Sequence, residues 1–179
     1  FPINGCNVDK GALTKINIPR SHLARFQTIE YLRAFMAGRL GWAQLQSLLI
    51  ISGAFGLFNK DRVVEVGGYL TSSERYEKDT VGEDMELVVR LNRHMREKKL
   101  PYIILYAFKV NCWTEVPDTL PVLYKQRDRW QRGLIDILFF FFFLQVNPRY
   151  GRIGFVSIPY FFFFVLLGPF LEMQGFFLF

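Results

Sequence analysis

Residues 120–146 read LPVLYKQRDRWQRGLIDILFFFFFLQV and contain the change in character on which the fold depends. The stretch carries five charged side chains up to Gly133 and only one, Asp136, after it. The whole chain divides in the same way, because 34 of its 38 charged residues precede residue 134 while 14 of its 20 phenylalanines follow Gly133. So apolar a segment aggregates unless lipid or protein covers it, which excludes a wholly soluble protein, a disordered protein and a disulfide scaffold.

The charged part of the chain accounts for the entire net charge of +6, since residues 1–133 hold 20 basic and 14 acidic side chains. Positive charge next to an apolar segment favours the cytoplasmic side of a membrane. The basic residues are scattered and no recognition motif accompanies them, so we expect no nucleic-acid partner. The chain begins at Phe1 and ends within an apolar run at Phe179, and we interpret it as a piece of a longer membrane protein.

Helical and strand-like patterns alternate in the first 133 residues. Apolar residues at helical spacing predict three helices, at 22–39, 83–99 and 118–133. Runs rich in apolar and β-forming residues predict buried strands at 48–52, 54–58 and 102–110. Polar residues 71–82 predict a loop. Alternation of this kind is typical of an α/β domain.

The Phe-rich part predicts two membrane-associated elements. Residues 134–146 are too short to cross a bilayer and apolar nearly all round, which predicts a helix lying in the interface. Residues 153–171 are 19 uncharged residues, enough for one transmembrane helix, with kinks expected at Pro159 and at Gly168-Pro169. Glu172 interrupts the apolar run and fits either an intramembrane role or the far interface.

The first candidate site is Glu83-Asp84, at the start of the predicted helix 83–99. Helix N-terminal amides and the helix dipole stabilise a carboxylate there, and an ionised carboxylate can take a proton from an attacking hydroxyl. First-turn acids also stabilise helices without any catalytic role, and position alone favours that simpler explanation.

The second candidate site is Gln126, Arg129 and Trp130, which share one helix face at i, i+3 and i+4, with Gly133 beside them. Arg binds phosphate oxygens in a fork and Trp stacks on a sugar ring, so the group suits a nucleotide diphosphate and a sugar acceptor. The same residues equally fit a basic helix at a membrane surface, with Trp130 as an interface anchor.

A third candidate is the small-residue corner Ser52-Gly53-Ala54, whose backbone can approach a ligand closely, although a tight bend explains it more simply. We expect no metal site within this chain. No two Asp residues stand at i,i+2, and neither His has a carboxylate or Cys at ligand spacing. The chain also lacks a phosphate-binding P-loop and a nucleophile elbow.

These pieces occur in a particular order along the chain: S-G-A-F, G-G-Y, V-G-E-D-M-E-L, W-T-E-V-P, Q-R-D-R-W-Q-R-G and then apolar segments. The order resembles the membrane-integrated glycosyltransferases of family 2, which include cellulose, hyaluronan, chitin and poly-N-acetylglucosamine synthases. The resemblance covers nearly the whole chain. Its most specific element is Q-x-x-R-W at 126–130, about 40 residues after an acidic E-D pair.

The resemblance implies an α/β fold, namely the acceptor-side half of a GT-A domain followed by an interfacial helix and a transmembrane helix. The corresponding ranges are 1–133, 134–150 and 151–179. The resemblance also implies a plasma-membrane protein with several spans and a cytoplasmic catalytic part. In the family a nucleotide-binding half, with the ligands for Mg²⁺ or Mn²⁺, precedes this region, so we expect the isolated 179 residues to be inactive.

The resemblance further implies an inverting transfer of a sugar from a nucleotide sugar, with a UDP-sugar as the expected donor, to a glycan or lipid acceptor. Asp84 matches the catalytic base of the family's T-E-D motif, Glu83 precedes it, and Gly82 replaces the Thr. Gln126, Arg129 and Trp130 match the motif that holds the donor diphosphate and the acceptor end. Ser52-Gly53-Ala54 falls near the acceptor sugar. The alternative is a non-catalytic basic membrane-docking module or a degenerate partner subunit.

Overall fold

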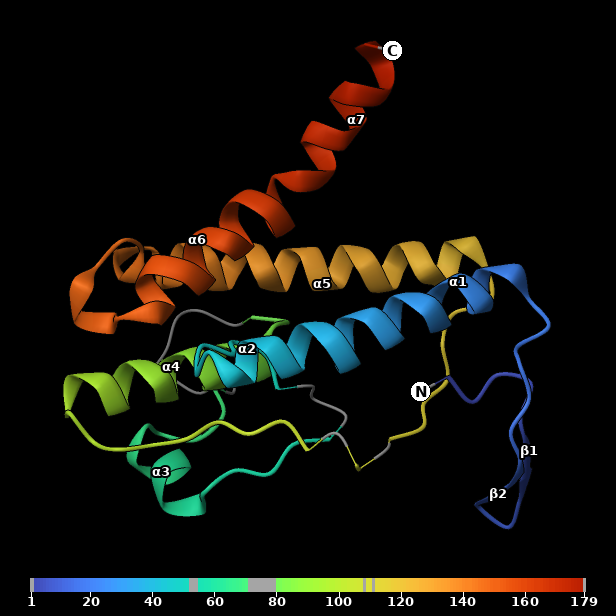
Figure 1. Ribbon diagram of the computed structural model, residues 1–179, viewed down its shortest axis with the longest axis horizontal. Coiled ribbons are helices and arrows are strands. Elements are labelled where there is room, and N and C mark those ends of the chain that lie inside the picture. Colours follow the sequence, from blue (N-terminus) through green and yellow to red (C-terminus); the bar gives the residue numbers. More distant parts are fainter. Residues whose placement is uncertain (1, 52–54, 71–79, 108, 111, 179) are drawn as a thin grey trace. The chain divides into compact units, whose positions relative to one another are not determined.

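The computed structural model describes residues 2–51, 55–70, 80–107, 109–110 and 112–178, which form two compact units. The first unit contains residues 1–44 and 105–128, and the second contains residues 45–104 and 129–179. The chain passes from the first unit to the second within helix α5 (Leu120–Phe140). Figure 1 labels the elements in chain order.

The first unit begins with the short antiparallel strands β1 (Asn7–Asp9) and β2 (Ala12–Lys15). Asn4 and Gly5 form a turn before β1, with Gly5 at a φ of 88°, which glycine adopts without strain. A continuous helical run follows, composed of α1 (His22–Tyr31), a π-helical segment (Leu32–Arg39) and α2 (Leu40–Gln44). It confirms the helix predicted at 22–39 and extends it by five residues.

Polar side chains connect distant parts of the first unit. The Asn4 side-chain amide donates to the Val116 carbonyl at 2.9 Å and accepts from the Val116 amide at 2.8 Å. The buried Gln27 Nε2 donates to the Pro117 carbonyl at 2.5 Å. Arg127 donates to both carboxylate oxygens of Glu30, at 2.7 and 2.6 Å, a bidentate pair that fixes α1 against α5. The W-T-E-V-P segment at 113–117 is thus held by the N-terminal segment and by α1.

The second unit contains α3 (Lys60–Glu65), α4 (Glu83–Glu97) and the C-terminal part of α5. Short 3₁₀ turns follow at Phe142–Leu144 and Pro148–Tyr150. The helix predicted at 83–99 is confirmed as α4. The short helix α3 ends before Gly67-Gly68, and Asn59 caps its start by accepting from the Arg62 amide at 3.2 Å.

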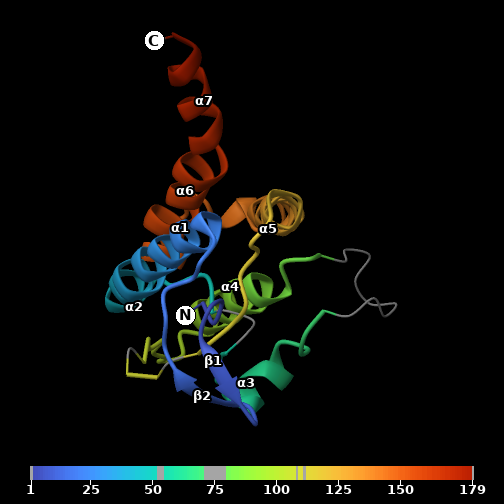
Figure 2. The same ribbon diagram turned by 90° about the vertical axis from the view of Figure 1, so that its right-hand side faces the viewer.

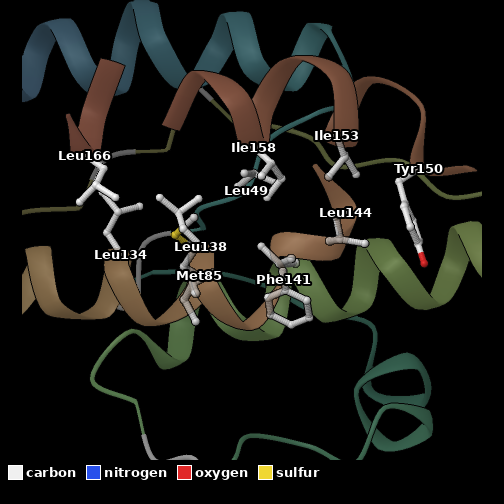
Figure 3. Close-up of a cluster of buried hydrophobic side chains, with 12 residues drawn as sticks. Leu49, Met85, Leu134, Leu138, Phe141, Leu144, Tyr150, Ile153, Ile158 and Leu166 are labelled. Atoms are coloured by element: carbon white, nitrogen blue, oxygen red, sulfur yellow. The ribbon is translucent and has the colours of Figure 1, made fainter. Parts of the chain in front are cut away.

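One hydrophobic cluster forms the core of the second unit (Figure 3). Met85 and Val89 come from α4, and residues of α5 and of the apolar C-terminal helix pack against them. The largest fully buried apolar side chains of the cluster are Leu49, Ile137, Leu138, Leu144, Ile153 and Ile158. Each such side chain contributes about 1.5–3 kcal/mol relative to an exposed one, so this cluster is the main source of stability in the unit.

The strands predicted at 48–52 and 102–110 are wrong for the described residues in those ranges, which have no strand pairing. Leu48 and Leu49 are buried as expected, but a strand needs backbone partners. The backbone of Ile104, in the second of these ranges, bonds to a side chain instead. The Gln46 Nε2 donates to the Ile104 carbonyl and the Gln46 Oε1 accepts from the Ile104 amide, both at 3.1 Å. The Gln46 side chain thus bonds the backbone of one residue in this range, where a neighbouring strand would bond several. The strand predicted at 54–58 is not formed at residues 55–58.

The helix predicted at 134–146 is not a separate helix, because α5 continues through this stretch to Phe140. Leu134, Ile137, Leu138 and Phe141 are buried in the core of the second unit. The opposite face remains apolar and exposed, with Phe139 at 64% exposure. Apolarity all round therefore reflects one face that packs against protein and one face that does not.

An apolar helical run, Ile153–Leu178, follows the 3₁₀ turns and is long enough to cross a membrane (Figure 2). It comprises π-helical segments at Ile153–Ser157 and Phe161–Leu166, α6 (Ile158–Tyr160) and α7 (Gly168–Leu178). Its 26 residues span about 39 Å at 1.5 Å per residue, against a hydrocarbon core of about 30 Å. π-Helical turns flank α6, which contains Pro159, and the regular pattern is interrupted at Leu167. Glu172 is exposed on α7.

The first turn of α4 meets α5 through two glycines. A Cβ added to Gly133 would lie 2.9 Å from the Cα and the N of Gly82, and a Cβ on Gly82 would lie 3.0 Å from the Gly133 Cα. Both obstacles are backbone atoms, so a side chain at either position would push the two segments apart. Glycine is therefore required here for close approach rather than for a positive φ.

We predict that Gly133→Ala lowers the stability of the protein. Overpacking costs about 1–3 kcal/mol, which exceeds the gain of about 1 kcal/mol that alanine brings to a helix interior. The midpoint of thermal unfolding in detergent measures the effect. Gly41→Ala is the matched control, because α2 leaves nothing within 4 Å of its added Cβ. Equal midpoints for the two variants would contradict the close contact.

Candidate functional site

The predicted acids Glu83 and Asp84 occupy the first turn of α4, as expected. Glu83 is exposed and Asp84 is half-buried. The Asp84 Oδ1 accepts from the Met85 amide at 2.8 Å, which fixes one carboxylate oxygen near the helix terminus. The next two residues, Met85 and Glu86, are buried, so packing of these neighbours fixes the turn that carries Asp84 in the second unit.

The residue before these acids explains a feature of the sequence. Gly82 is the N-cap of α4 but has no side chain to cap it. Instead the Gly82 amide donates to the Thr80 Oγ1 at 3.2 Å. A threonine at position 82, as in the T-E-D motif, would meet the Gly133 backbone. The small residue at 82 and the hydroxyl at 80 thus belong to the same packing arrangement.

Thr80 also ties this turn to α5. Its Oγ1 lies 3.0 Å from the Asp136 Oδ2 and donates to it while accepting from the Gly82 amide. Asp136 is one of four charged residues after Gly133, and the sequence alone assigns it no role. Its isolation among apolar residues is the sequence feature that indicates a specific polar partner.

Arg129 and Trp130 lie on α5 one turn before Gly133, so both stand close along the helix to the point where α4 meets it. Both are exposed, Trp130 at 43%. The glycine contact therefore brings the turn that carries Asp84 to within about one helical turn of these two residues along α5. Gln126 lies a further turn back on the same helix, and its Oε1 is buried with no hydrogen-bond partner among the described residues.

A pocket of about 310 Å³ opens beside this contact. Thr80 and Val81 line one part of it, and Arg132, Ile135 and Asp136 of α5 line the rest. The pocket thus lies between the segment that leads into α4 and the helix that carries Arg129 and Trp130. It combines one cation, one anion and an apolar wall, a lining that suits a polar ligand with apolar faces.

The i,i+4 pair of Glu86 and Arg90 is present in α4 and is buried. Glu86 and Arg90 of α4 are joined by two hydrogen bonds of 2.7 and 2.8 Å, with side-chain exposures of 3% and 11%. Arg90 also donates to the carbonyls of Val66 and of Gly68, the latter at 2.6 Å. The i,i+4 spacing predicts the pair, but only the fold shows that it clamps the G-G-Y segment after α3.

Two predicted features cannot be placed as predicted. Ser52, Gly53 and Ala54 lie outside the described residues, as does most of the loop predicted at 71–82.

In the described part of the chain, no three His, Cys, Asp or Glu side chains gather in a way that could hold a metal ion.

The chain belongs to glycosyl transferase family group 2, whose family model matches residues 10–179. The family has the GT-A fold.

Among curated proteins, the chain is 34% identical over 142 residues to the poly-beta-1,6-N-acetyl-D-glucosamine synthase of Staphylococcus aureus (strain COL), covering 78% of this chain and 31% of that protein. It is 32% identical over 135 residues to the synthase of the same name from Staphylococcus epidermidis, covering 74% of this chain and 30% of that protein. The chain thus spans about a third of the length of these relatives. No solved structure matches it significantly.

We predict that Arg90→Met lowers the free energy of unfolding by about 3–5 kcal/mol, because it leaves the buried Glu86 carboxylate without a counter-charge. Adding Glu86→Leu should recover part of the loss. The control is Arg62→Met, which breaks an exposed pair with Glu65 and should cost much less, because exposed ion pairs contribute little to stability. Thermal unfolding of the three variants measures the losses of stability. Equal losses in Arg90→Met and Arg62→Met would contradict a stabilising role for the buried ion pair.

Proposed function

We propose that this chain is part of an inverting glycosyltransferase that moves a sugar from a nucleotide sugar, a UDP-sugar by family resemblance, to a glycan or lipid acceptor at a membrane. Family membership supports glycosyl transfer. The observation that carries the site is the contact between Gly82 and Gly133, which brings the turn with Asp84 against the helix with Arg129 and Trp130.

Asp84 is the proposed general base. It takes the proton of the acceptor hydroxyl as that oxygen forms a bond to the anomeric carbon, while the bond from that carbon to the donor diphosphate breaks on the opposite face and the configuration inverts. Its place at the start of a 15-residue helix suits this role, because the amides and the dipole there stabilise the carboxylate. Glu83, exposed beside it, adds negative charge at the same helix end.

Arg129, Trp130 and Gln126 are the proposed substrate-binding residues. The exposed Arg129 guanidinium can pair with the leaving diphosphate and offset the charge that develops on it. Trp130, still 43% exposed, offers a ring face on which an acceptor sugar can stack. The buried Gln126 Oε1, unpartnered among the described residues, leaves an acceptor for a ligand hydroxyl. Ser52, Gly53 and Ala54 remain in the proposal as an acceptor-side corner.

A divalent cation, Mg²⁺ or Mn²⁺, remains part of the proposal for the complete enzyme on the strength of the family resemblance. It would neutralise charge on the diphosphate. Among the described residues, no cluster of His, Cys, Asp or Glu fits such an ion.

We also propose that Ile153–Leu178 crosses the plasma membrane, with the charged part of the chain on the cytoplasmic side. The length and apolarity of the helix support the span, and the net positive charge before it supports the orientation. The proposed partners are a nucleotide-sugar donor, a glycan or lipid acceptor and the bilayer.

A second candidate function is a non-catalytic membrane-docking module or degenerate partner subunit. Exposed Arg129 and Trp130, together with the exposed phenylalanines at the end of α5, favour contact with a membrane surface. This candidate predicts no dependence of any transfer reaction on Asp84.

We predict that Asp84→Asn, made in the complete gene product, lowers the rate of sugar transfer about 10²- to 10⁴-fold, the usual contribution of a general base. Donor binding should be largely unchanged, because the amide keeps the size of the carboxylate. Membranes containing the protein are incubated with radiolabelled nucleotide sugars, and transfer is compared with binding of the same donor.

Asp61→Asn is the matched control, since Asp61 is an exposed acid in the first turn of α3 and should leave transfer unchanged. Equal losses of donor binding and transfer in Asp84→Asn would assign Asp84 a structural role. Full transfer in that variant would favour the docking module.

A further inference from the structure

A second pocket, of about 680 Å³, lies at the opposite end of α4 from Asp84. The 15 residues of α4 separate the two ends by about 22 Å, so this pocket is distinct from the proposed catalytic site. Three cationic side chains line it, with one carboxylate, one phenol and an apolar wall: Arg96, Lys99, Arg149, Glu97, Tyr102 and Leu100.

The one carboxylate is already engaged. Glu97 accepts from the Arg93 Nε and from the Tyr150 hydroxyl, each at 2.9 Å. Burial alone raises the pKa of Glu97, but these two hydrogen bonds and the charges of Arg93 and Arg149 hold it below its ordinary value. Glu97 therefore stays ionised, with both donors bound to its Oε1, and the three cations leave the pocket with an excess of positive charge.

The three cations are not matched by acids of their own. In the described part of the chain, no carboxylate forms an ion pair with Arg96, Lys99 or Arg149. Arg96 is oriented by its Nε, which donates to the Tyr102 hydroxyl at 3.0 Å, and by its position over the Tyr102 ring at 5.7 Å.

Helix geometry explains only part of this arrangement. Cations in the last turn offset the negative end of a helix dipole, which accounts for Arg96 and Lys99. The helix dipole does not account for Arg149, which comes from a separate 3₁₀ turn (Pro148–Tyr150). The Asn147 Oδ1 caps this turn by accepting from the Arg149 amide at 3.0 Å. Two elements therefore bring positive charge to one pocket.

The position of the pocket along the chain indicates its occupant. Arg149 stands four residues before Ile153, where the apolar helix begins. Exposed apolar side chains from Phe142, Phe143 and Val146 precede it. A pocket at the polar end of a span, basic within and apolar beside, suits a lipid whose phosphate meets the cations and whose chains follow the apolar surface.

We propose that the pocket of Arg96, Lys99 and Arg149 binds the head group of an anionic phospholipid. The proposal goes beyond glycosyl transfer and rests only on the apolar helix lying in a bilayer. It requires that the negative lipid be preferred over a zwitterionic one and over free phosphate.

Protection of Lys99 tests the proposal in the unmodified protein. The protein in neutral detergent is acetylated with and without a short-chain phosphatidylglycerol, and the labelling of Lys99 is compared with that of its exposed neighbour Lys98, which does not line the pocket. We expect slower labelling of Lys99 alone, with no protection by short-chain phosphatidylcholine or by inorganic phosphate. Equal protection by phosphate would show a simple anion site, and no selective protection would remove the site; either result overturns the proposal.

Charge variants give a second measurement. Lys99→Gln with Arg149→Gln should weaken binding of the short-chain phosphatidylglycerol about 30-fold, from about 1 kcal/mol for each basic residue. The control is Lys98→Gln with Lys60→Gln, which removes the same charge from exposed positions outside the pocket. Equal weakening by both pairs would mean general attraction to a positive surface and would contradict a pocket. Neither measurement uses sugar transfer, so the outcome is independent of the catalytic proposal.

Discussion

The contact between the backbones of Gly82 and Gly133 is the constraint on which the second unit depends. It lets the first turn of α4 approach α5 to a distance that no side chain permits. The hydrogen bond from Thr80 to Asp136 closes the same junction from the side. Behind it, Met85 of α4 packs with Leu134 and Leu138 of α5 in the hydrophobic cluster, so polar and apolar contacts reinforce one geometry. The proposed base and the proposed phosphate-binding residue are both supported by this junction.

Much of the helical architecture could be predicted from the sequence, because its signals are local. Acids at the start of α4 and bases at its end match the helix dipole, so the charge pattern marks both ends of the helix predicted at 83–99. The candidate residues Asp84, Arg129 and Trp130 were also visible in the sequence, since their spacing and order depend on the chain alone. The sequence did not show that the gap between the two sites is closed by glycines at 82 and 133.

The features that could not be predicted all depend on distant partners. Residues 102–107 have the composition of a strand, but no strand pairs with them, and the backbone of Ile104 bonds to the Gln46 side chain instead. The apolar residues after Gly133 resemble a membrane-surface helix by composition, whereas the structure buries one of their faces against α4 and the apolar helix. Asp136 is only an isolated acid until Thr80 is found beside it. In each case the sequence indicates the polar or apolar character of the residues correctly but does not identify the distant partner that they contact.

Cysteine cross-linking between Thr80 and Asp136 tests the junction most directly. Both positions are changed to Cys after Cys6 and Cys112 are replaced by Ser, and the protein in membranes is treated with a short bifunctional thiol reagent. We expect rapid intramolecular cross-linking of this pair, since the native side chains are hydrogen-bonded at 3.0 Å. A control pair at Lys98 and Asp136 should not react, because Lys98 lies at the far end of α4, about 22 Å from its start. Failure of the first pair, or equal reaction of both, would contradict the close approach of α4 to α5.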